Sequence, residues 1–154
     1  MVRVEDSIVV ARPIEDVFDY LTDPETLPEW QGSALEARVE GEGPMRAGSR
    51  VLETRKFLGR RLESTMEVVE YEPPRRFAIK VGSGPVPFTA TNSLSEADGG
   101  TRIEAVIEGE PGGFFRLAEP LVVRALGREM RNNLATLKDV LEERGSDAAS
   151  AGEA

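Results

Sequence analysis

The longest stretch with helical apolar periodicity lies near the C-terminus, from Gly113 to Arg144, and it sets what the rest of the chain must provide. If this stretch forms a helix of about 30 residues, a set of apolar residues spaced three and four positions apart lies on one of its faces. That set is Val123, Leu126, Met130, Leu134, Leu137 and Leu141. A shorter set, Phe114, Leu117, Leu121 and Ala125, centres roughly 170° away around the helix. Pro120 separates the two sets, so we expect a bent or two-part helix that a sheet must cover.

Upstream of this helix the pattern is mostly that of strands and turns. A first strand is expected over 3–11, followed by two short helices, one over 14–21 and one that holds Leu27 and Trp30. Further strands are expected over 35–39, 50–58, 60–71, 77–81, 88–95 and 102–108, separated by Gly, Pro and Asp-Gly turns. The predicted fold class is α+β, a curved seven-stranded antiparallel sheet around the long C-terminal helix.

Composition bounds the domain organisation and the function. We expect one domain over 1–144 and a disordered tail of small and acidic residues over 145–154. The chain contains no cysteine and no histidine, which excludes disulfides, zinc–thiolate sites, cysteine nucleophiles and histidine bases. We therefore expect no metal site and no cofactor.

Charge and hydropathy bear on location and partners. The net charge of −9 argues against binding to nucleic acid or to an anionic membrane. No stretch approaches the ~18 apolar residues of a membrane span, and no signal-peptide pattern opens the chain, so we expect a cytoplasmic protein. The basic clusters Arg55-Lys56, Arg60-Arg61 and Arg75-Arg76 are interpreted as solvated turn charges. Arg124, Arg128 and Arg131 recur at helical spacing and predict a basic strip beside the acidic Glu129 and Asp139.

Four local segments, in this order and spacing, resemble the START-like (SRPBCC) superfamily, in particular its polyketide cyclase/dehydrase and lipid-transport branch. They are Ala11-Arg12-Pro13-Ile14-Glu15-Asp16-Val17-Phe18, Leu27-Pro28-Glu29-Trp30, the run from Val68 to Arg76, and Gly99-Gly100-Thr101-Arg102-Ile103. The resemblance implies the Bet v 1-like helix-grip, a bent sheet around a C-terminal helix with a hydrophobic cavity between them. Such cavities bind lipids, sterols or polyketides, and a minority of members catalyse cyclisation or dehydration.

The inward strand faces predict which residues would contact a ligand in such a cavity. With the first short helices and the minor stripe of the long helix, the expected set is Trp30, Met66, Val68, Phe77, Ile79, Phe88, Ala90, Asn92, Ile103, Ala105, Leu117, Leu121 and Ala125. A filled core is the alternative for each of them. Trp30 either packs in the core or lines the entrance, and Asn92 either bonds within the sheet or meets a polar group of a ligand.

Glu53 and Arg55 form a possible polar lining whose direction is ambiguous. If Val51 and Phe57 point inward, these two charged residues point inward with them and must pair. The opposite phase buries Leu52 and Leu58 and leaves both charges in water. The solvent-facing phase is the favoured interpretation, because charged residues on strands usually face solvent.

Three functions are therefore open. The first is a binding protein, monomeric or homodimeric, that holds a small hydrophobic or amphipathic molecule. The second is a cyclase, aromatase or dehydratase that orients a polyketide-like substrate with Glu53, Arg55 and Asn92. The third is a module that regulates a partner protein, which would have a filled core and an exposed apolar patch.

Overall fold

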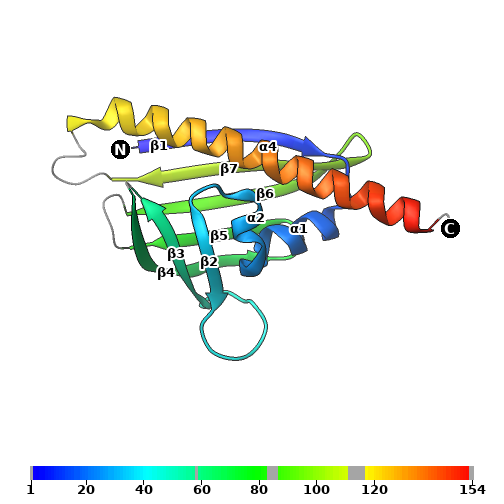
Figure 1. The fold of residues 1–154 in the computed structure, drawn as a ribbon, viewed down its shortest axis with the longest axis horizontal. Helices are drawn as coiled ribbons and strands as arrows, with labels where there is room; N and C mark the ends of the chain where they lie inside the picture. Colours follow the sequence, from blue (N-terminus) through cyan, green and yellow to red (C-terminus); the bar gives the residue numbers. More distant parts are fainter. Residues whose placement is uncertain (1, 58, 83–86, 111–116, 153–154) are drawn as a thin grey trace.

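A computed structural model describes residues 2–57, 59–82, 87–110 and 117–152. In the described parts of the chain, the sheet contains β1 (Val2–Val10), β2 (Ala34–Val39), β3 (Arg50–Phe57), β4 (Arg60–Glu72), β5 (Arg76–Val81), β6 (Phe88–Ala97) and β7 (Gly100–Gly109). The short helices α1 (Ile14–Thr22), η1 (Pro24–Thr26) and α2 (Leu27–Trp30) connect β1 to β2, and the long helix α4 (Glu119–Gly152) follows β7 (Figure 1). The predicted α+β helix-grip is confirmed.

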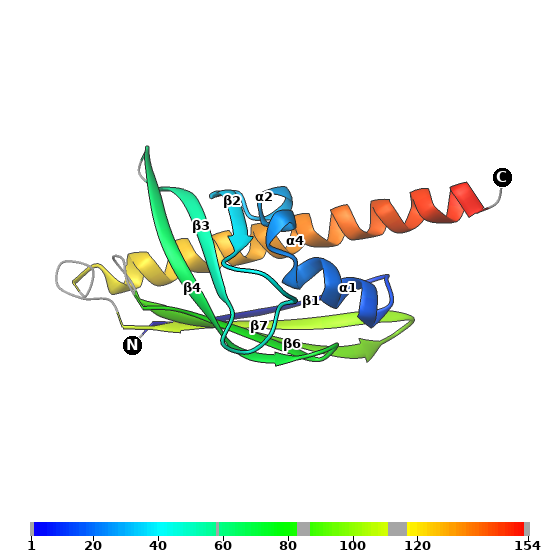
Figure 2. The same ribbon diagram turned by 90° about the horizontal axis from the view of Figure 1, so that it is seen from below.

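The sheet is antiparallel throughout, in the order β1-β7-β6-β5-β4-β3-β2. Register shifts in β2 and β4 mark bulges, which bend strands and increase their twist. As a result β3 and β4 turn away from β6 and β7 and rise beside α4 (Figure 2). The helices α1, α2 and α4 lie on one face of the sheet, which we call the inner face.

The C-terminal half of α4 is hydrogen-bonded to the edge strand β1 and to the two residues that follow this strand. Lys138 Nζ donates to the Val9 carbonyl at 2.8 Å, and the Ala11 amide donates to Glu142 at 3.4 Å. Arg12 Nη1 donates to the Leu141 carbonyl at 2.7 Å. Beneath these bonds the later stripe of α4 is buried in the core, at Met130, Leu134, Leu137 and Leu141, and α4 contacts β1 and α2. These contacts cover an edge that would otherwise be open to other strands.

One prediction about the long helix is wrong, because α4 continues past Arg144 to Gly152, about two turns beyond its predicted end. Pro120 is the second residue of α4, where its missing N–H costs nothing. Leu117 is helical and Ala118 lies in a turn, so the helical stretch is interrupted just before α4, and the described residues do not contradict a bent or two-part helix. Phe114 lies outside the described residues. That the tail is disordered in solution stays a prediction.

Candidate functional site

The charged pair of β3 lies on the inner face of the sheet. The register places Glu53 between Ala37 of β2 and Ser64 of β4, in the same phase as the buried Val51. Glu53 is only 4% exposed, and the Arg55 side chain is 26% exposed. The favoured solvent-facing interpretation was therefore wrong. Burial is tolerated because Arg55 Nε donates to Glu53 Oε1 at 2.8 Å, so neither charge is left without an opposite one.

Arg55 is the centre of a wider polar network. Its Nη1 donates to Ser33 Oγ at 2.8 Å, and its Nη2 donates to Gln31 Oε1. Ser33 Oγ in turn donates to Glu129 Oε1 at 2.9 Å. The network therefore connects β3 to the segment between α2 and β2 and to the middle of α4. None of these partners stood out in the sequence, because an isolated Ser, Gln or Glu in a loop or a helix carries no signal of its own.

Two polar atoms in this region are buried without a hydrogen-bond partner among the described residues: Glu53 Oε2 and Trp30 Nε1. The other carboxylate oxygen of Glu53 accepts from Arg55 and from Ser64 Oγ, the latter at 3.3 Å. Trp30 ends α2 and directly precedes Gln31 of the network. Buried polar groups are nearly always paired. The inner face thus presents one free acceptor and one free donor.

The inner face is covered unevenly. Among the predicted ligand-contacting residues, a first group is buried: Trp30, Met66, Val68, Phe77, Ile103 and Ala105. A second group keeps part of its surface exposed: Ile79, Phe88, Ala90 and Asn92. Asn92 faces inward between Phe77 and Ala105, and its amide makes no hydrogen bond to a described residue.

The partly exposed group lies under the first half of α4. Ile79, Ala90, Ile107 and Val4 form one row across the sheet, and Gly127 of α4 approaches the side chain of Val4. The facing helix residues Val122, Val123 and Leu126 are also only partly buried. The inner face therefore has a packed half, under the part of α4 that is hydrogen-bonded to β1, and a more open half under the beginning of α4.

Leu117, Leu121 and Ala125 do not join the inner-face residues. All three are exposed, Leu117 by 87% and Leu121 by 67%. The later stripe of α4 fixes which face of the helix meets the sheet, and residues half a turn away then point to solvent. The expectation that this stripe faces the interior was wrong. Contact of these three residues with a ligand stays a prediction.

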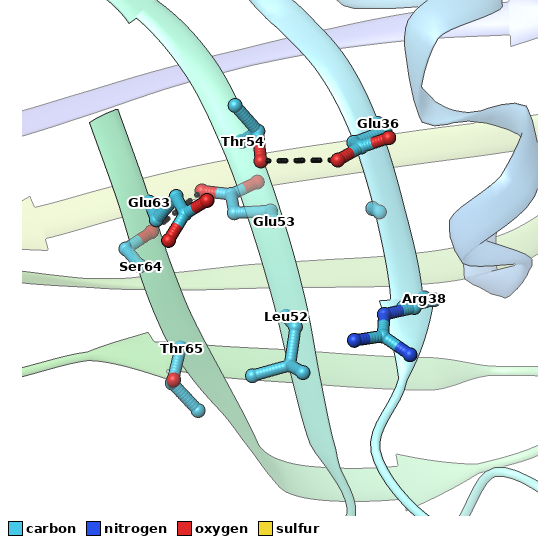
Figure 3. A pocket seen from close by; sticks show the side chains of 9 residues that line it. Glu36, Arg38, Leu52, Glu53, Thr54, Glu63, Ser64 and Thr65 are labelled. Carbon is cyan, nitrogen blue, oxygen red and sulfur yellow. Dashed lines mark hydrogen bonds between the residues drawn. The ribbon is translucent and has the colours of Figure 1, made fainter. Parts of the chain in front are cut away.

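A hollow of about 340 Å³ lies elsewhere, over β3 between β2 and β4 (Figure 3). Its lining residues are Glu36, Ala37, Arg38, Leu52, Glu53, Thr54, Glu63, Ser64 and Thr65. All of them except Ala37, Glu53 and Ser64 belong to the strand phase that projects from the outer face of the sheet. Thr54 Oγ1 donates to Glu36 at 3.4 Å. No residue of α4 is among the lining residues, so the hollow is not the predicted cavity between the sheet and that helix.

Tyr20 of α1 is a third buried polar group. Its hydroxyl has no hydrogen-bond partner among the described residues, and the Arg144 guanidinium lies 5.1 Å from the centre of its ring. Burial, with a contribution from the nearby Glu29 carboxylate, raises the pKa of Tyr20 to about 12, while Arg144 acts in the opposite direction. Arg144 also forms an ion pair with Glu29. This cluster connects α1 and α2 to the later turns of α4.

Tyr20→Phe is expected to raise the free energy of unfolding at pH 7 by about 1 kcal/mol, because it removes a buried hydroxyl without a partner. The raised pKa favours the neutral phenol in the folded state. The wild-type protein should therefore lose stability as the pH rises from about 10 to about 12, and the variant should lose less. Urea unfolding across this range measures both effects. Tyr71→Phe is the control, and an equal change in both variants would contradict the assignment to Tyr20.

The comparisons with known proteins agree with this geometry. The sequence profile of the family described as "Polyketide cyclase / dehydrase and lipid transport" matches residues 1–142. The chain belongs to this family. No curated protein sequence matches it. Among the described residues of this polyketide cyclase/dehydrase family member, no side-chain cluster suits a metal ion, and no helix is long and apolar enough to span a membrane.

Solved structures similar to this family member show the same fold. A START superfamily protein from Mycobacterium smegmatis has 16% identity and a TM-score of 0.73, over 95% of this chain and 98% of the other. The di-domain ARO/CYC StfQ from the steffimycin biosynthetic pathway has 18% identity and a TM-score of 0.77, over 94% of this chain and 52% of the other. Ara h 8.0201 has 13% identity and a TM-score of 0.62, over 88% and 97%.

Proposed function

We propose that the protein binds a small amphipathic molecule between the inner face of the sheet and α4. The molecule would have an apolar body and at least one hydroxyl or N–H group. The observation that carries this proposal is Glu53 Oε2, a buried carboxylate oxygen without a partner among the described residues. Family membership supports a small hydrophobic ligand in general.

The free atoms define which groups the ligand would present. A carboxylate only accepts hydrogen bonds, so the group that meets Glu53 Oε2 must be a donor. The indole N–H of Trp30 only donates, so a carbonyl or ether oxygen would complement it. Apolar rings or chains would cover the partly exposed Ile79, Phe88 and Ala90. Phenolic and polyketide-like molecules combine all three features.

A matched pair of probes tests the proposal. We expect 2-naphthol to bind about tenfold more tightly than 2-methoxynaphthalene, because only the naphthol donates to a charged acceptor. In Glu53→Gln this ratio should fall below about threefold. Glu63→Gln, a change on the exposed outer face of β4, is the control and should preserve the ratio. Fluorescence titration measures all three proteins, and an equal ratio in wild type and Glu53→Gln would contradict the proposal.

A second candidate function is cyclisation or dehydration of a polyketide-like substrate. It is favoured by the same pair, because Glu53 would take a proton from carbon next to a carbonyl, and an Arg55 N–H would stabilise the enolate oxygen that forms. Asn92 would orient the chain from the opposite side. Conversion of a poly-β-ketone, followed by NMR, would support catalysis if Glu53→Gln abolishes it. Binding without conversion would favour carriage alone.

A further inference from the structure

One end of the molecule combines exposed leucines with unpaired cations. Along the solvent-facing side of the first turns of α4 lie, in order, Leu121, Arg124, Arg128 and Arg131, and Leu117 lies two residues before the helix begins. All five are exposed, and the spacing of the four residues in α4 keeps them within one face of the helix. The three arginines form no ion pair or side-chain hydrogen bond with a described residue. Arg12 and Arg144, by contrast, each form an ion pair with a carboxylate.

The hairpin between β3 and β4 adds a second basic group at the same end. Lys56, Arg60 and Arg61 are exposed and, among the described residues, have no ion-pair partner. Leu62 beside them is 40% exposed. Figures 1 and 2 both show the end of β3, the start of β4 and the beginning of α4 on the side of the molecule away from α1, and in Figure 2 the two strands project beyond α4. We call Lys56, Arg60, Arg61, Arg124, Arg128 and Arg131 the basic end.

We propose that the basic end docks on the surface of a bilayer that contains anionic lipids. Exposed leucines next to cations are the composition of an interfacial helix, whose apolar side chains enter the acyl boundary while the cations contact headgroups. Arg124 lies about 5 Å and Arg128 about 10 Å from Leu121 along the helix axis. We place the beginning of α4 inclined toward the bilayer with its first turn deepest, so that with Leu117 and Leu121 at the acyl boundary both arginines fall at the depth of the headgroups.

The net charge of −9 argues against an anionic membrane only as an average over the whole chain, and the local arrangement of charges overrides it here because electrostatic attraction at a membrane is local. At physiological ionic strength the Debye length is about 8 Å, so charges at the far end of the molecule are screened. Near the basic end, Arg3 forms ion pairs with Glu5 and Glu108, and its single positive charge offsets one of these two carboxylates. Glu63 on β4 lies next to the hairpin cations, and Glu110 and Glu119 lie after β7 and at the start of α4. The attraction therefore depends on the exposed face of α4 that carries Arg124, Arg128 and Arg131.

The position of this surface also suits ligand transfer. The more open half of the inner face, with Phe88, Ala90 and Val123, lies under the beginning of α4. Docking there would bring this half close to the lipids, so that an amphipathic molecule could pass between bilayer and protein without crossing water. This last step rests on the proposed function, whereas the docking itself does not.

Vesicle flotation tests the docking. We expect the full chain to bind vesicles of phosphatidylcholine with 30% phosphatidylserine and not vesicles of phosphatidylcholine alone. Each arginine near an anionic surface contributes about fivefold to binding, so Arg124→Glu/Arg128→Glu should lower it by at least about 25-fold. The control Arg46→Glu/Arg50→Glu makes the same charge change near the β2–β3 loop and should have little effect.

A second variant tests the leucines separately. Leu117→Ser/Leu121→Ser should lower binding to the same vesicles by about tenfold or more, since two exposed leucines no longer enter the acyl boundary. Circular dichroism would verify that each variant is folded. The proposal is overturned if phosphatidylserine does not promote binding or if the control variant loses as much as the arginine variant. Binding to an acidic protein with no binding to vesicles would also overturn it.

Discussion

Arg55→Met is expected to lower the free energy of unfolding by about 3 kcal/mol. The change leaves Glu53 buried without its opposite charge and also removes the donors to Ser33 and Gln31. A buried carboxylate that loses its partner costs far more than the ion pair contributes, because the desolvation of the charge is no longer offset. Urea unfolding monitored by circular dichroism at pH 7 measures the loss.

Two further variants separate the charge from the packing. Glu53→Gln/Arg55→Met removes both charges and should recover at least half of the lost stability, since a neutral amide is cheaper to bury than an unpaired carboxylate. Arg38→Met changes an exposed strand arginine and should stay within about 0.5 kcal/mol of wild type. If Arg55→Met costs less than about 1 kcal/mol, the pair does not hold the inner face together as described.

The order of strands and helices was predictable because local rules determine it. Asp98-Gly99 predicted a hairpin, and both residues adopt the positive φ angles, 39° and 78°, that such a turn requires. In β5, Phe77 and Val81 are buried and Lys80 is exposed, as the alternation predicts, whereas Ala78 in the opposite phase is also buried. The period-2 pattern and the turn residues otherwise agree, which is why the antiparallel sheet follows from the sequence.

The phase of β3 was not predictable in the same way. This strand carries apolar residues in both phases, Val51 in one and Leu52 in the other, so periodicity leaves its direction open. The pairing of Glu53 with Ala37 and Ser64 decides it, and pairing depends on strands that are distant in the sequence. In the sequence, Ser64 lies at period-2 spacing from Met66 and Val68, which puts the three side chains on one face of the strand. That grouping contained the only signal for this part of the site.

The hydrogen-bond network around Arg55 was even harder to predict from the sequence. Ser33 and Glu129, which share a hydrogen bond, are separated by 96 residues. No spacing rule connects a loop serine to a helix glutamate at such a distance. The exposed position of Leu121 has a similar cause, because the face of α4 that meets the sheet is selected by packing against β1 and not by the helix itself.

Leu137→Ala is expected to lower the free energy of unfolding by about 2–5 kcal/mol. Leu137 is 0% exposed, and it belongs to the stripe that packs α4 onto the core. The matched control is Leu121→Ala, the same change at a leucine of the same helix that is 67% exposed, which should stay within about 0.5 kcal/mol of wild type. Thermal and urea unfolding measure both. Similar losses in the two variants would mean that the beginning of α4 is packed as firmly as its later turns. Such a result would contradict the division of the inner face into a packed half and an open half.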